Sequence, residues 1–336
     1  MKIWMPYLAA GTGADVSTQY LARGLEERGH TVVLQPFSRW FEPVPWLLRA
    51  VKPPEGTEAS ITNTWNGFAF ARPGIPMITV DRLFVLDPAL TPYKSPLQGI
   101  YHNTFVRRFV TASARRAEVV VAVSEYTADM IARTIGVCRP KVILNAVDTE
   151  FFTPAGRTGA PNGTRPICLL HVGKPSRRKG ADLLPPIMKS LGAGYQLYYT
   201  GSESAFSEYG KPAPNMTSLG RLSQEEIRDQ YRRADVLLFP SRGEGLARAI
   251  MEALACGTPV VAANISSMPE AVDDHVGRLC PPDDIPSFVA AIKTLTSDDK
   301  IWQQHSNAAR QRAEQRFCLN RLLDEFEALL AGVVAR

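Results

Sequence analysis

The chain has 336 residues, of which 45% are hydrophobic and 21% are charged, a balance typical of a folded enzyme with two domains. The net charge of +5 comes without a basic stripe interleaved with aromatic residues, which argues against nucleic-acid binding, and no apolar run reaches the ~18 residues of a membrane-spanning helix. The five cysteines are scattered without a C-x-x-C pair, so we expect neither disulfides nor zinc, and a reducing, cytoplasmic setting.

Short apolar runs followed by helical patterns recur along the chain, which predicts parallel β-α-β layers. The expected strands are 2–6, 31–35, 77–80, 119–123, 167–172, 196–199, 236–240 and 259–262, and the expected helices include 17–28 and 316–334. Residues 152–163, rich in Pro, Gly and Thr, indicate a linker.

We therefore predict an α/β chain with two Rossmann-like, doubly wound parallel-sheet domains. The first covers 1–155 and the second 156–315, and the last helix, within 316–336, packs back on the first domain. The carboxyl ends of both sheets are expected to face one cleft, since ligands bind there in open parallel sheets.

A glycine turn, Gly11-Thr12-Gly13, follows the first expected strand and precedes the first helix. Such a turn lets backbone amides and a helix N-terminus approach an anion closely. A dinucleotide fingerprint would add a glycine near position 16 and an acid after the second strand, where this chain has Val16 and Gln35. The turn therefore indicates either contact with an anionic ligand or an ordinary tight β-to-α connection.

The loop at 171–180 reads HVGKPSRRKG and follows the first strand of the second half. Its basic side chains are His171, Lys174, Arg177, Arg178 and Lys179. Clustered cations suit a diphosphate, whose negative charge grows as a nucleotide leaves. The loop is not a Walker loop, and a solvated charge run is the alternative. Its place after a strand and its two glycines favour a functional loop.

Residues 239–261 read FPSRGEGLARAIMEALACGTPVV, which predicts a strand, a glycine turn, a helix, a glycine C-cap and another strand. Glu244 lies in the turn, and Glu252 lies about two helical turns further on, nearly on the same face. Two such carboxylates suit a sugar hydroxyl and a ribose hydroxyl, with the amides of 245–247 facing phosphate. Taken alone, acids eight residues apart are usually surface residues, but the apolar neighbours of Glu252 argue against full exposure.

The segment 239–261 closely resembles the E-x7-E signature of family 4 retaining glycosyltransferases, which have the GT-B fold. The loop at 172–180 resembles the family's V-G-R…K-G element, and residues 144–154 resemble its N-G-V-D…F-x-P element. Smaller matches lie at 123–126, 219–223, 234–236, 269–272 and 277–279. The resemblance spans the whole chain, weakly in the first half and strongly from about residue 145 onward.

The resemblance implies a role for each matching residue. Lys174, where the family usually has arginine, and Lys179 would bind the donor diphosphate, Glu252 would hold the ribose hydroxyls, and Glu244 would contact the donor sugar. Gly13 would sit beneath the diphosphate. The implied catalytic residues are Lys174, Lys179 and Glu244, and the implied donor-binding residues are Gly11, Gly13, Gly173, Lys174, Lys179, Glu244, Gly245, Leu246, Ala247 and Glu252.

The resemblance also implies an enzyme that needs no metal and no cofactor, with the nucleotide-diphosphate sugar as a co-substrate. The Asp-Asp pairs of this chain, at 273–274, 283–284 and 298–299, are accordingly expected in loops and helix caps rather than at a metal.

Two residues depart from the family pattern. The family often has a histidine after the strand at 77–80, where this chain has Asp81, which accepts a hydrogen bond but supplies no imidazole. Ala247-Arg248 replaces a usual glycine-apolar pair. We assign Asp81 to the sugar or acceptor side, together with Trp65, whose ring is suited to stacking on a sugar.

Two further segments of the first half suit a lipid-linked acceptor at a membrane surface. Residues 39–49 mix aromatic, apolar and basic side chains, and four arginines lie on an expected helix at 107–116. Packing of both segments against their own domain is the alternative.

The sequence thus predicts metal-independent hexosyl transfer, with retention, from a nucleotide-diphosphate sugar to a hydroxyl of a glycan, a lipid-linked sugar or a small molecule. This activity belongs to glycan, polysaccharide or lipopolysaccharide biosynthesis, in the cytoplasm or at the inner face of the membrane, and involves no nucleic acid. The alternatives are a GT-B sugar phosphorylase, a nucleotide-sugar epimerase and a non-catalytic nucleotide-sugar-binding subunit. The base, the sugar and the acceptor are left open.

Overall fold

The computed structural model describes residues 1–154 and 165–335. The chain divides into two compact units: unit 1 is Met1–Ala146 with Leu319–Arg336, and unit 2 is Val147–Cys318. The boundaries between the units therefore lie at 146/147 and 318/319. The boundaries predicted from the sequence were 155/156 and 315/316. Most of the expected linker at 152–163 lies outside the described residues.

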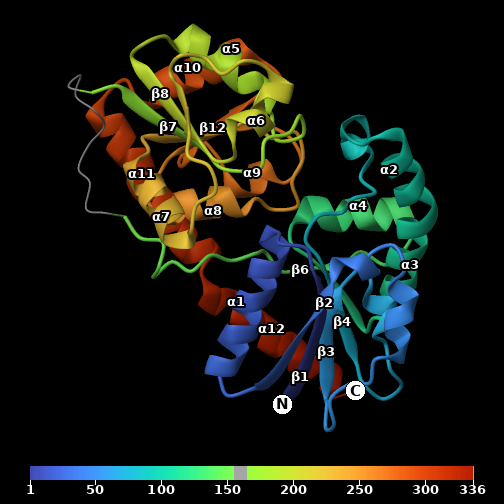
Figure 1. Ribbon diagram of the computed structural model, residues 1–336. Helices are drawn as coiled ribbons and strands as arrows, with labels where there is room; N and C mark the ends of the chain where they lie inside the picture. The colour runs from blue at the N-terminus through green and yellow to red at the C-terminus, as the bar shows by residue number, and fades with distance from the viewer. Residues whose placement is uncertain (155–164, 336) are drawn as a thin grey trace. The chain divides into compact units, whose positions relative to one another are not determined.

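Unit 1 contains a six-stranded parallel sheet in the order β2-β1-β3-β4-β5-β6 (Figure 1). Its strands are β1 (Lys2–Ala9), β2 (Thr31–Ser38), β3 (Ala59–Asn63), β4 (Met77–Asp81), β5 (Val119–Ala122) and β6 (Lys141–Val142). Its α-helices are α1 (Gly13–Glu27), α2 (Pro96–Tyr101), α3 (Arg107–Arg116), α4 (Glu125–Ile135) and α12 (Leu319–Val334). Short helical turns at η1 (Arg39–Phe41), η2 (Pro45–Ala50) and η5 (His102–Val106) also belong to this unit.

The last helix, α12, packs on α1 within unit 1 (Figure 1). Gly24 allows this close approach, because a Cβ there would lie 2.7 Å from a methyl carbon of Leu323. Arg28 Nη1 adds ion pairs to Asp324 at 2.5 Å and to Glu327 at 2.6 Å. Apolar contact and charge together hold the end of the chain to its beginning.

Unit 2 contains a second six-stranded parallel sheet, in the order β12-β11-β10-β7-β8-β9. Its strands are β7 (Ile167–His171), β8 (Tyr195–Tyr199), β9 (Met216–Ser218), β10 (Val236–Phe239), β11 (Val260–Ala263) and β12 (Gly277–Cys280). Its α-helices are α5 (Leu184–Leu191), α6 (Glu203–Phe206), α7 (Gln224–Arg233), α8 (Arg248–Ala255), α9 (Met268–Ala271), α10 (Ile285–Leu295) and α11 (Asp299–Arg316).

Side chains of the second sheet alternate between two buried faces. Leu169, Val236 and Val261 point into the core that α5 and α10 cover, and this core includes Leu184 and Ile292. The residues next to them in each strand point to the opposite face, where α7, α8 and α11 pack. Because both faces are covered, the strands are apolar throughout, which is why the sequence reveals them as short hydrophobic runs.

The predicted α/β fold with two parallel sheets is confirmed, and so are two of the predicted caps. Asp284 accepts a hydrogen bond from the Ser287 amide at the start of α10, and Asp298 caps α11. The single helix expected at 316–334 is wrong at its start. There the chain leaves α11 after Arg316, forms a β-bridge at Cys318 and begins α12 at Leu319. Within the described residues, no helix combines the length and apolarity required to cross a bilayer.

Candidate functional site

The two loops that carry the predicted donor residues leave adjacent strands of unit 2. The loop at 172–180 follows β7, and the loop at 240–247 follows β10. β7 and β10 are neighbours in the sheet, although the connections from them run to opposite edges. Connections diverge from the strand ends at such a switch point and leave space for a ligand.

Gly180 brings these two loops into contact. It has a φ of +71°, and a Cβ at this position would lie 2.3 Å from the Pro240 carbonyl oxygen. The Arg242 amide donates to the Arg178 carbonyl at 2.7 Å, which joins the loops a second time. A glycine is therefore required at position 180 for both its conformation and its space.

Glu244 is the centre of the site. Its Oε1 accepts from Lys179 Nζ at 2.5 Å, from Ser241 Oγ at 2.7 Å and from Arg178 Nη1 at 3.2 Å. Only 10% of the Glu244 side chain is exposed. Burial raises the pKa of this carboxyl, but Lys179 and Arg178 outweigh burial and hold the pKa below its ordinary value. The group is thus a fixed, ionised acceptor between two cations.

The backbone of Glu244 is held by the segment after β11. Its amide donates to Ser266 Oγ at 3.1 Å, and its carbonyl accepts from Ser267 Oγ at 3.2 Å. Ser266 has a φ of +51°, a conformation that non-glycine residues rarely adopt. The serine pair therefore positions the turn that carries the carboxylate.

Arg242 is a structural residue of the site that the sequence analysis missed. It is 7% exposed and forms a bidentate ion pair with Asp182, at 2.7 and 2.9 Å. A third contact joins it to Asp283 at 2.6 Å. Asp283 therefore pairs with an arginine, whereas its neighbour Asp284 caps α10. No local signal predicts these contacts, because the partners lie 60 and 41 residues away along the chain.

Glu252 lies on α8 and is buried, with 8% of the residue exposed. Its Oε2 accepts from the Tyr231 hydroxyl at 3.0 Å, and its Oε1 accepts from Arg248 Nη2 at 2.8 Å. Burial first, and the Glu252 carboxylate second, raise the pKa of Tyr231 well above its ordinary value. Because each carboxylate oxygen has two lone pairs, Glu252 keeps acceptor capacity beyond these two contacts.

Lys174 lies in the same loop as Lys179 but is exposed. The loop around it is fixed from two sides, since Thr200 Oγ1 accepts from the Gly173 amide at 2.9 Å and Pro175 packs on Gly201. A Cβ on Gly201 would lie 2.5 Å from Pro175. Lys174 is thus an exposed cation on an anchored backbone, and Glu244 pairs with Lys179 and Arg178 instead.

His171, which the sequence analysis counted among the basic groups, contributes no charge. It is 1% exposed at the end of β7, and burial lowers its pKa to about 4. Its Nδ1 lies 3.1 Å from the Leu238 carbonyl oxygen, so the ring joins β7 to β10. Its ring stacks on Phe239, over which the Lys179 ammonium lies 5.2 Å from the ring centre.

The turn between Glu244 and α8 is buried. Gly245, Leu246 and Ala247 occupy it, with Ala247 as the N-cap residue of α8. Within residues 1–154 and 165–335, no backbone carbonyl accepts a hydrogen bond from the amides of Leu246 and Ala247. Amides at a helix N-terminus are suited to a negatively charged group.

In unit 1, the glycine turn after β1 already surrounds a carboxylate. The amides of Ala10, Gly11 and Thr12 all approach Asp15 Oδ2, at 2.9, 2.6 and 3.3 Å. Gly11 has a φ of +69°, and Gly13 is the first residue of α1. Because Asp15 already accepts from these amides, an external anion would have to replace it there.

Asp81 ends β4 and is 4% exposed. Its Oδ2 accepts from the Thr64 hydroxyl at 2.6 Å. Burial raises the pKa of the Asp81 carboxyl to about 6, and the Thr64 contact only partly offsets burial. Trp65, the other residue assigned to the acceptor side, is half-buried and meets the ring of His102 edge-on, with ring centres 5.6 Å apart.

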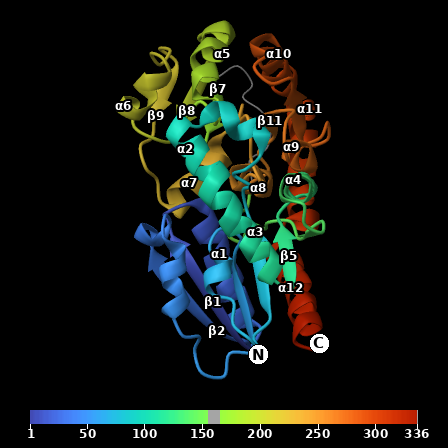
Figure 2. The ribbon, with the colours of Figure 1, turned by 90° about the vertical axis from the view of Figure 1, so that its right-hand side faces the viewer.

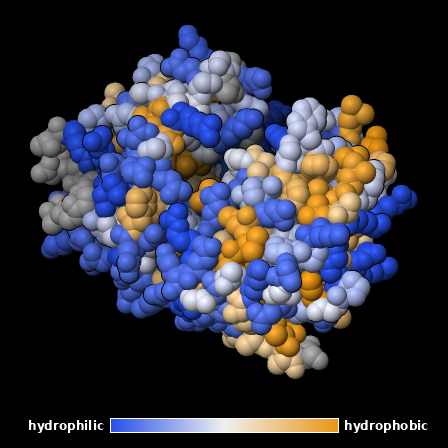
Figure 3. Space-filling model, turned by 60° about the horizontal axis from the view of Figure 1, so that its bottom comes forward, coloured by the Kyte–Doolittle hydropathy of each residue, from blue (hydrophilic) through white to orange (hydrophobic). Residues whose placement is uncertain are grey.

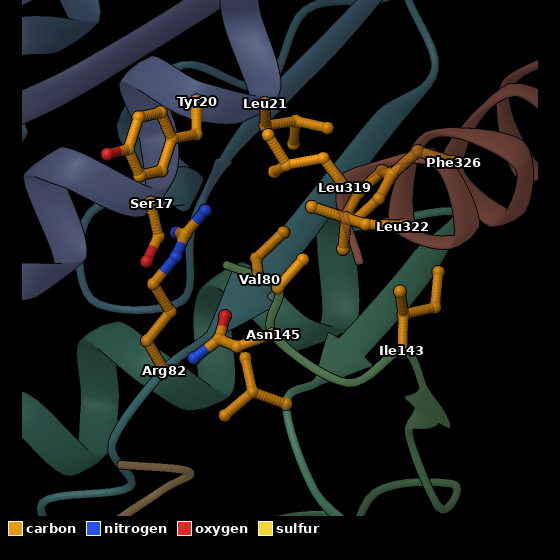
Figure 4. A pocket seen from close by; sticks show the side chains of 12 residues that line it. Ser17, Tyr20, Leu21, Val80, Arg82, Ile143, Asn145, Leu319, Leu322 and Phe326 are labelled. Carbon is orange, nitrogen blue, oxygen red and sulfur yellow. The ribbon is translucent and has the colours of Figure 1, made fainter. Parts of the chain in front are cut away.

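A cavity of unit 1 near the end of β4 is about the size of one water molecule. Figure 4 shows the Arg82 side chain extending toward Ser17 and Tyr20 of α1, with Leu322 and Phe326 of α12 on the other side. This cavity is too small for a sugar and marks instead where α1, α12 and the strand ends meet.

Two family models match the chain. The model described as Glycosyltransferase Family 4 matches residues 11–151, and the model described as Glycosyl transferases group 1 matches residues 166–298. The chain is 29% identical over 265 residues to an alpha-maltose-1-phosphate synthase of Mycobacterium tuberculosis, which covers 69% of this chain and 67% of that protein. It is 28% identical over 184 residues to a sulfoquinovosyl transferase of Arabidopsis thaliana, which covers 50% of this chain and 35% of the relative.

Solved structures share the fold along nearly the whole chain. The sucrose-phosphate synthase of Thermosynechococcus elongatus superposes with a TM-score of 0.82 at 18% identity, over 99% of both chains. The Anabaena protein HepE in complex with UDP-glucose superposes with a TM-score of 0.78 at 18% identity, over 99% of this chain and 100% of that one. With the two family models, this likeness shows that the chain belongs to the glycosyltransferases of the GT-B fold.

Proposed function

We propose that this chain moves a hexosyl group from a nucleotide-diphosphate sugar to a hydroxyl acceptor, with retention of the anomeric configuration and without a metal ion. The observation that carries the proposal is the buried Glu244 carboxylate, which Lys179 and Arg178 hold from two sides at the switch point of unit 2. This arrangement offers a fixed acceptor for a sugar hydroxyl beside cations for a diphosphate.

The diphosphate is assigned to Lys179 and Lys174. An ammonium has three donors, so Lys179 can keep its contact with Glu244 and still donate to a phosphate oxygen. Lys174, exposed on the same anchored loop, supplies a second charge. The amides at Gly245–Ala247, at the start of α8, are assigned to the same phosphates.

The ribose is assigned to Glu252, the second carboxylate of the E-x7-E pattern. Tyr231 and Arg248 already fix both of its oxygens, so the carboxylate is oriented before a ligand arrives. Such preorganisation reduces the entropy lost when a hydroxyl binds.

In the proposed reaction, the bond between the anomeric carbon and the donor phosphate oxygen breaks, and the acceptor oxygen forms the new bond on the same face. The proton of the acceptor hydroxyl passes to a phosphate oxygen of the donor. The departing nucleoside diphosphate therefore acts as the base. Lys179 and Lys174 stabilise the charge that develops on the leaving phosphates. We assign no side chain as a nucleophile or as a dedicated base.

The roles of the unit 1 residues are part of the same proposal. Asp81 and Trp65 are assigned to the sugar or acceptor, and Gly11 and Gly13 to the diphosphate. The acceptor is a glycan, a lipid-linked sugar or a small molecule, and the setting is the cytoplasm, including the inner face of the membrane.

A thermal-shift panel of UDP, GDP, ADP and dTDP sugars tests the donor class. A true donor at 100 times its dissociation constant stabilises the fold by about 2.7 kcal/mol, so one nucleotide should stand out. UDP-glucose comes first, because HepE is in complex with it. An equal, negligible response to all sugars would contradict the proposal.

Product analysis separates transfer from the two other enzyme classes. Incubation with the identified donor and a mixture of hydroxyl acceptors should release the nucleoside diphosphate and yield a glycoside that keeps the donor's anomeric configuration by NMR. Conversion of the donor sugar without an acceptor would indicate an epimerase, and glycoside cleavage that requires inorganic phosphate would indicate a phosphorylase.

A further inference from the structure

Unit 1 exposes a concentrated set of large apolar side chains. Seven such side chains are exposed among the described residues, and six of them lie within 40–47 and 97–105. They are Trp40 (83% exposed), Trp46 (42%), Leu47 (57%), Leu97 (80%), Ile100 (62%) and Phe105 (45%). Figure 3 shows orange atoms gathered on the right-hand side, where α2 and α3 lie in Figure 1. A concentration of this kind marks an interaction surface.

The two segments form one surface because they contact each other. The Tyr101 hydroxyl donates to the Glu42 carbonyl at 3.1 Å, and the rings of Trp46 and Phe109 lie 6.0 Å apart. Figure 2 shows α2 and α3 following one another as a continuous rod through η5.

This rod has a buried face and an exposed apolar stripe. His102, Val106 and Phe109 are buried against unit 1, whereas Leu97, Ile100 and Phe105 point outward. Apolar residues at spacings of three to five along a helix are normally covered, so the outer stripe lacks the partner that its composition calls for.

The charge around this stripe is mainly positive. Residues 88–117 contain no Asp or Glu, and their cations are Lys94, Arg107, Arg108, Arg115 and Arg116. The other segment adds Arg39 and Arg49 and a single acid, Glu42. All of these arginines are exposed, and Arg107 and Arg108 closely follow Phe105 in the same helical rod. An apolar stripe bordered by arginines is complementary to acyl chains beneath anionic headgroups.

We propose that this face of unit 1, which we call the apolar-basic face (residues 39–49 and 97–116), binds the surface of an anionic lipid bilayer. A second copy of the chain fits less well, since a two-fold contact would set the same arginines against each other. The inference rests on this surface alone and is independent of the donor site in unit 2.

The test is sedimentation of the full chain with vesicles of pure phosphatidylcholine or of phosphatidylcholine with phosphatidylglycerol. Binding is expected only to the anionic vesicles, and it should weaken as salt rises. The double variant Arg108→Gln/Arg115→Gln should bind about 30-fold more weakly, and Leu97→Ser/Ile100→Ser at least 10-fold more weakly.

The controls match these variants in chemistry but lie elsewhere. Lys189→Gln/Lys293→Gln removes two exposed cations from α5 and α10 of unit 2, and Val334→Ser removes the seventh exposed apolar side chain. Both should bind like the unaltered chain, and all variants should keep its donor-induced thermal shift.

Failure of the unaltered chain to bind anionic vesicles, or equal binding by all variants, would overturn the proposal. Self-association that Leu97→Ser/Ile100→Ser abolishes, without vesicle binding, would assign the face to a second copy. A missing donor shift with intact vesicle binding would count against the donor site only.

Discussion

Lys179 Nζ and Glu244 Oε1 lie 2.5 Å apart, although the two residues are 65 positions apart in the chain. Arg178 approaches the same oxygen at 3.2 Å. The pair exists because Gly180 lets the β7 loop touch the β10 loop. A close contact between two loops thus determines the charge arrangement of the site.

Lys179→Ala should reduce kcat by about 100-fold or more, because an oriented donor to the developing negative charge is lost. The fold should lose about 2 kcal/mol, since Arg178 still neutralises part of the Glu244 charge. Turnover of the identified donor and urea unfolding measure the two effects. Lys189→Ala, on the exposed surface of α5, is the control and should change neither.

The double variant Lys179→Ala/Glu244→Gln separates the two roles of the lysine. Removing the buried carboxylate charge should restore most of the lost stability but none of the lost turnover. Recovery of turnover in the double variant would show that Lys179 acts only by neutralising Glu244.

Gly180→Ala should lower the free energy of unfolding by at least 3 kcal/mol and also reduce turnover. The new Cβ costs about 1 kcal/mol for its left-handed backbone, and its 2.3 Å approach to the Pro240 oxygen forces the loops apart. Gly136→Ala is the matched control, because Gly136 has the same left-handed backbone, with a φ of +66° and a ψ of +40°, but nothing within 4 Å of the added Cβ. It should show only the cost of about 1 kcal/mol. Equal losses in the two variants would contradict the close approach.

The fold was largely predictable because the central strands, such as β4, β10 and β11, are buried throughout and therefore appear as apolar runs. The strands that escaped prediction are short or polar, such as β9 (Met216–Ser218) and β12 (Gly277–Cys280). For the site, local sequence suggested a cationic loop and two carboxylates. It did not reveal that Arg178 joins Lys179 at Glu244, or that Arg248 occupies an oxygen of Glu252, because tertiary packing decides those pairings.

The stability of the fold should depend on Asp81 between about pH 4 and pH 6. The folded-state pKa of Asp81 is about 6, above the ~3.9 of an unfolded chain, so the folded state binds more protons in this window. Stability from this group therefore falls as pH rises from about 4 to about 6. The cost above pH 6 is about 3 kcal/mol. Asp81→Asn should regain this stability at pH 7.5. It should also make the free energy of unfolding, measured from pH 4 to pH 7, less dependent on pH.

Activity decides whether Asp81 is also functional. If the carboxylate contacts the sugar or the acceptor, Asp81→Asn should gain stability at pH 7.5 and yet lose kcat/KM by at least 10-fold, about 1.4 kcal/mol. Asp274→Asn removes a carboxyl that is 90% exposed and should alter neither quantity. Unchanged kcat/KM in a stabilised Asp81→Asn variant would remove Asp81 from the site.

Glu252→Gln should raise the KM for the donor about 10-fold and leave kcat nearly unchanged. The ribose is remote from the anomeric carbon, so its contact stabilises the bound substrate and the transition state equally. The substitution keeps the acceptor for the Tyr231 hydroxyl but removes the charge that Arg248 pairs with, so modest destabilisation is expected.

Arg248→Gln is the comparison, because it removes the same ion pair and leaves the carboxylate in place. Its KM should change less than that of Glu252→Gln. Equal KM values in the two variants would mean that the ion pair, rather than the carboxylate, governs donor binding, and would contradict the assignment of Glu252 to the ribose.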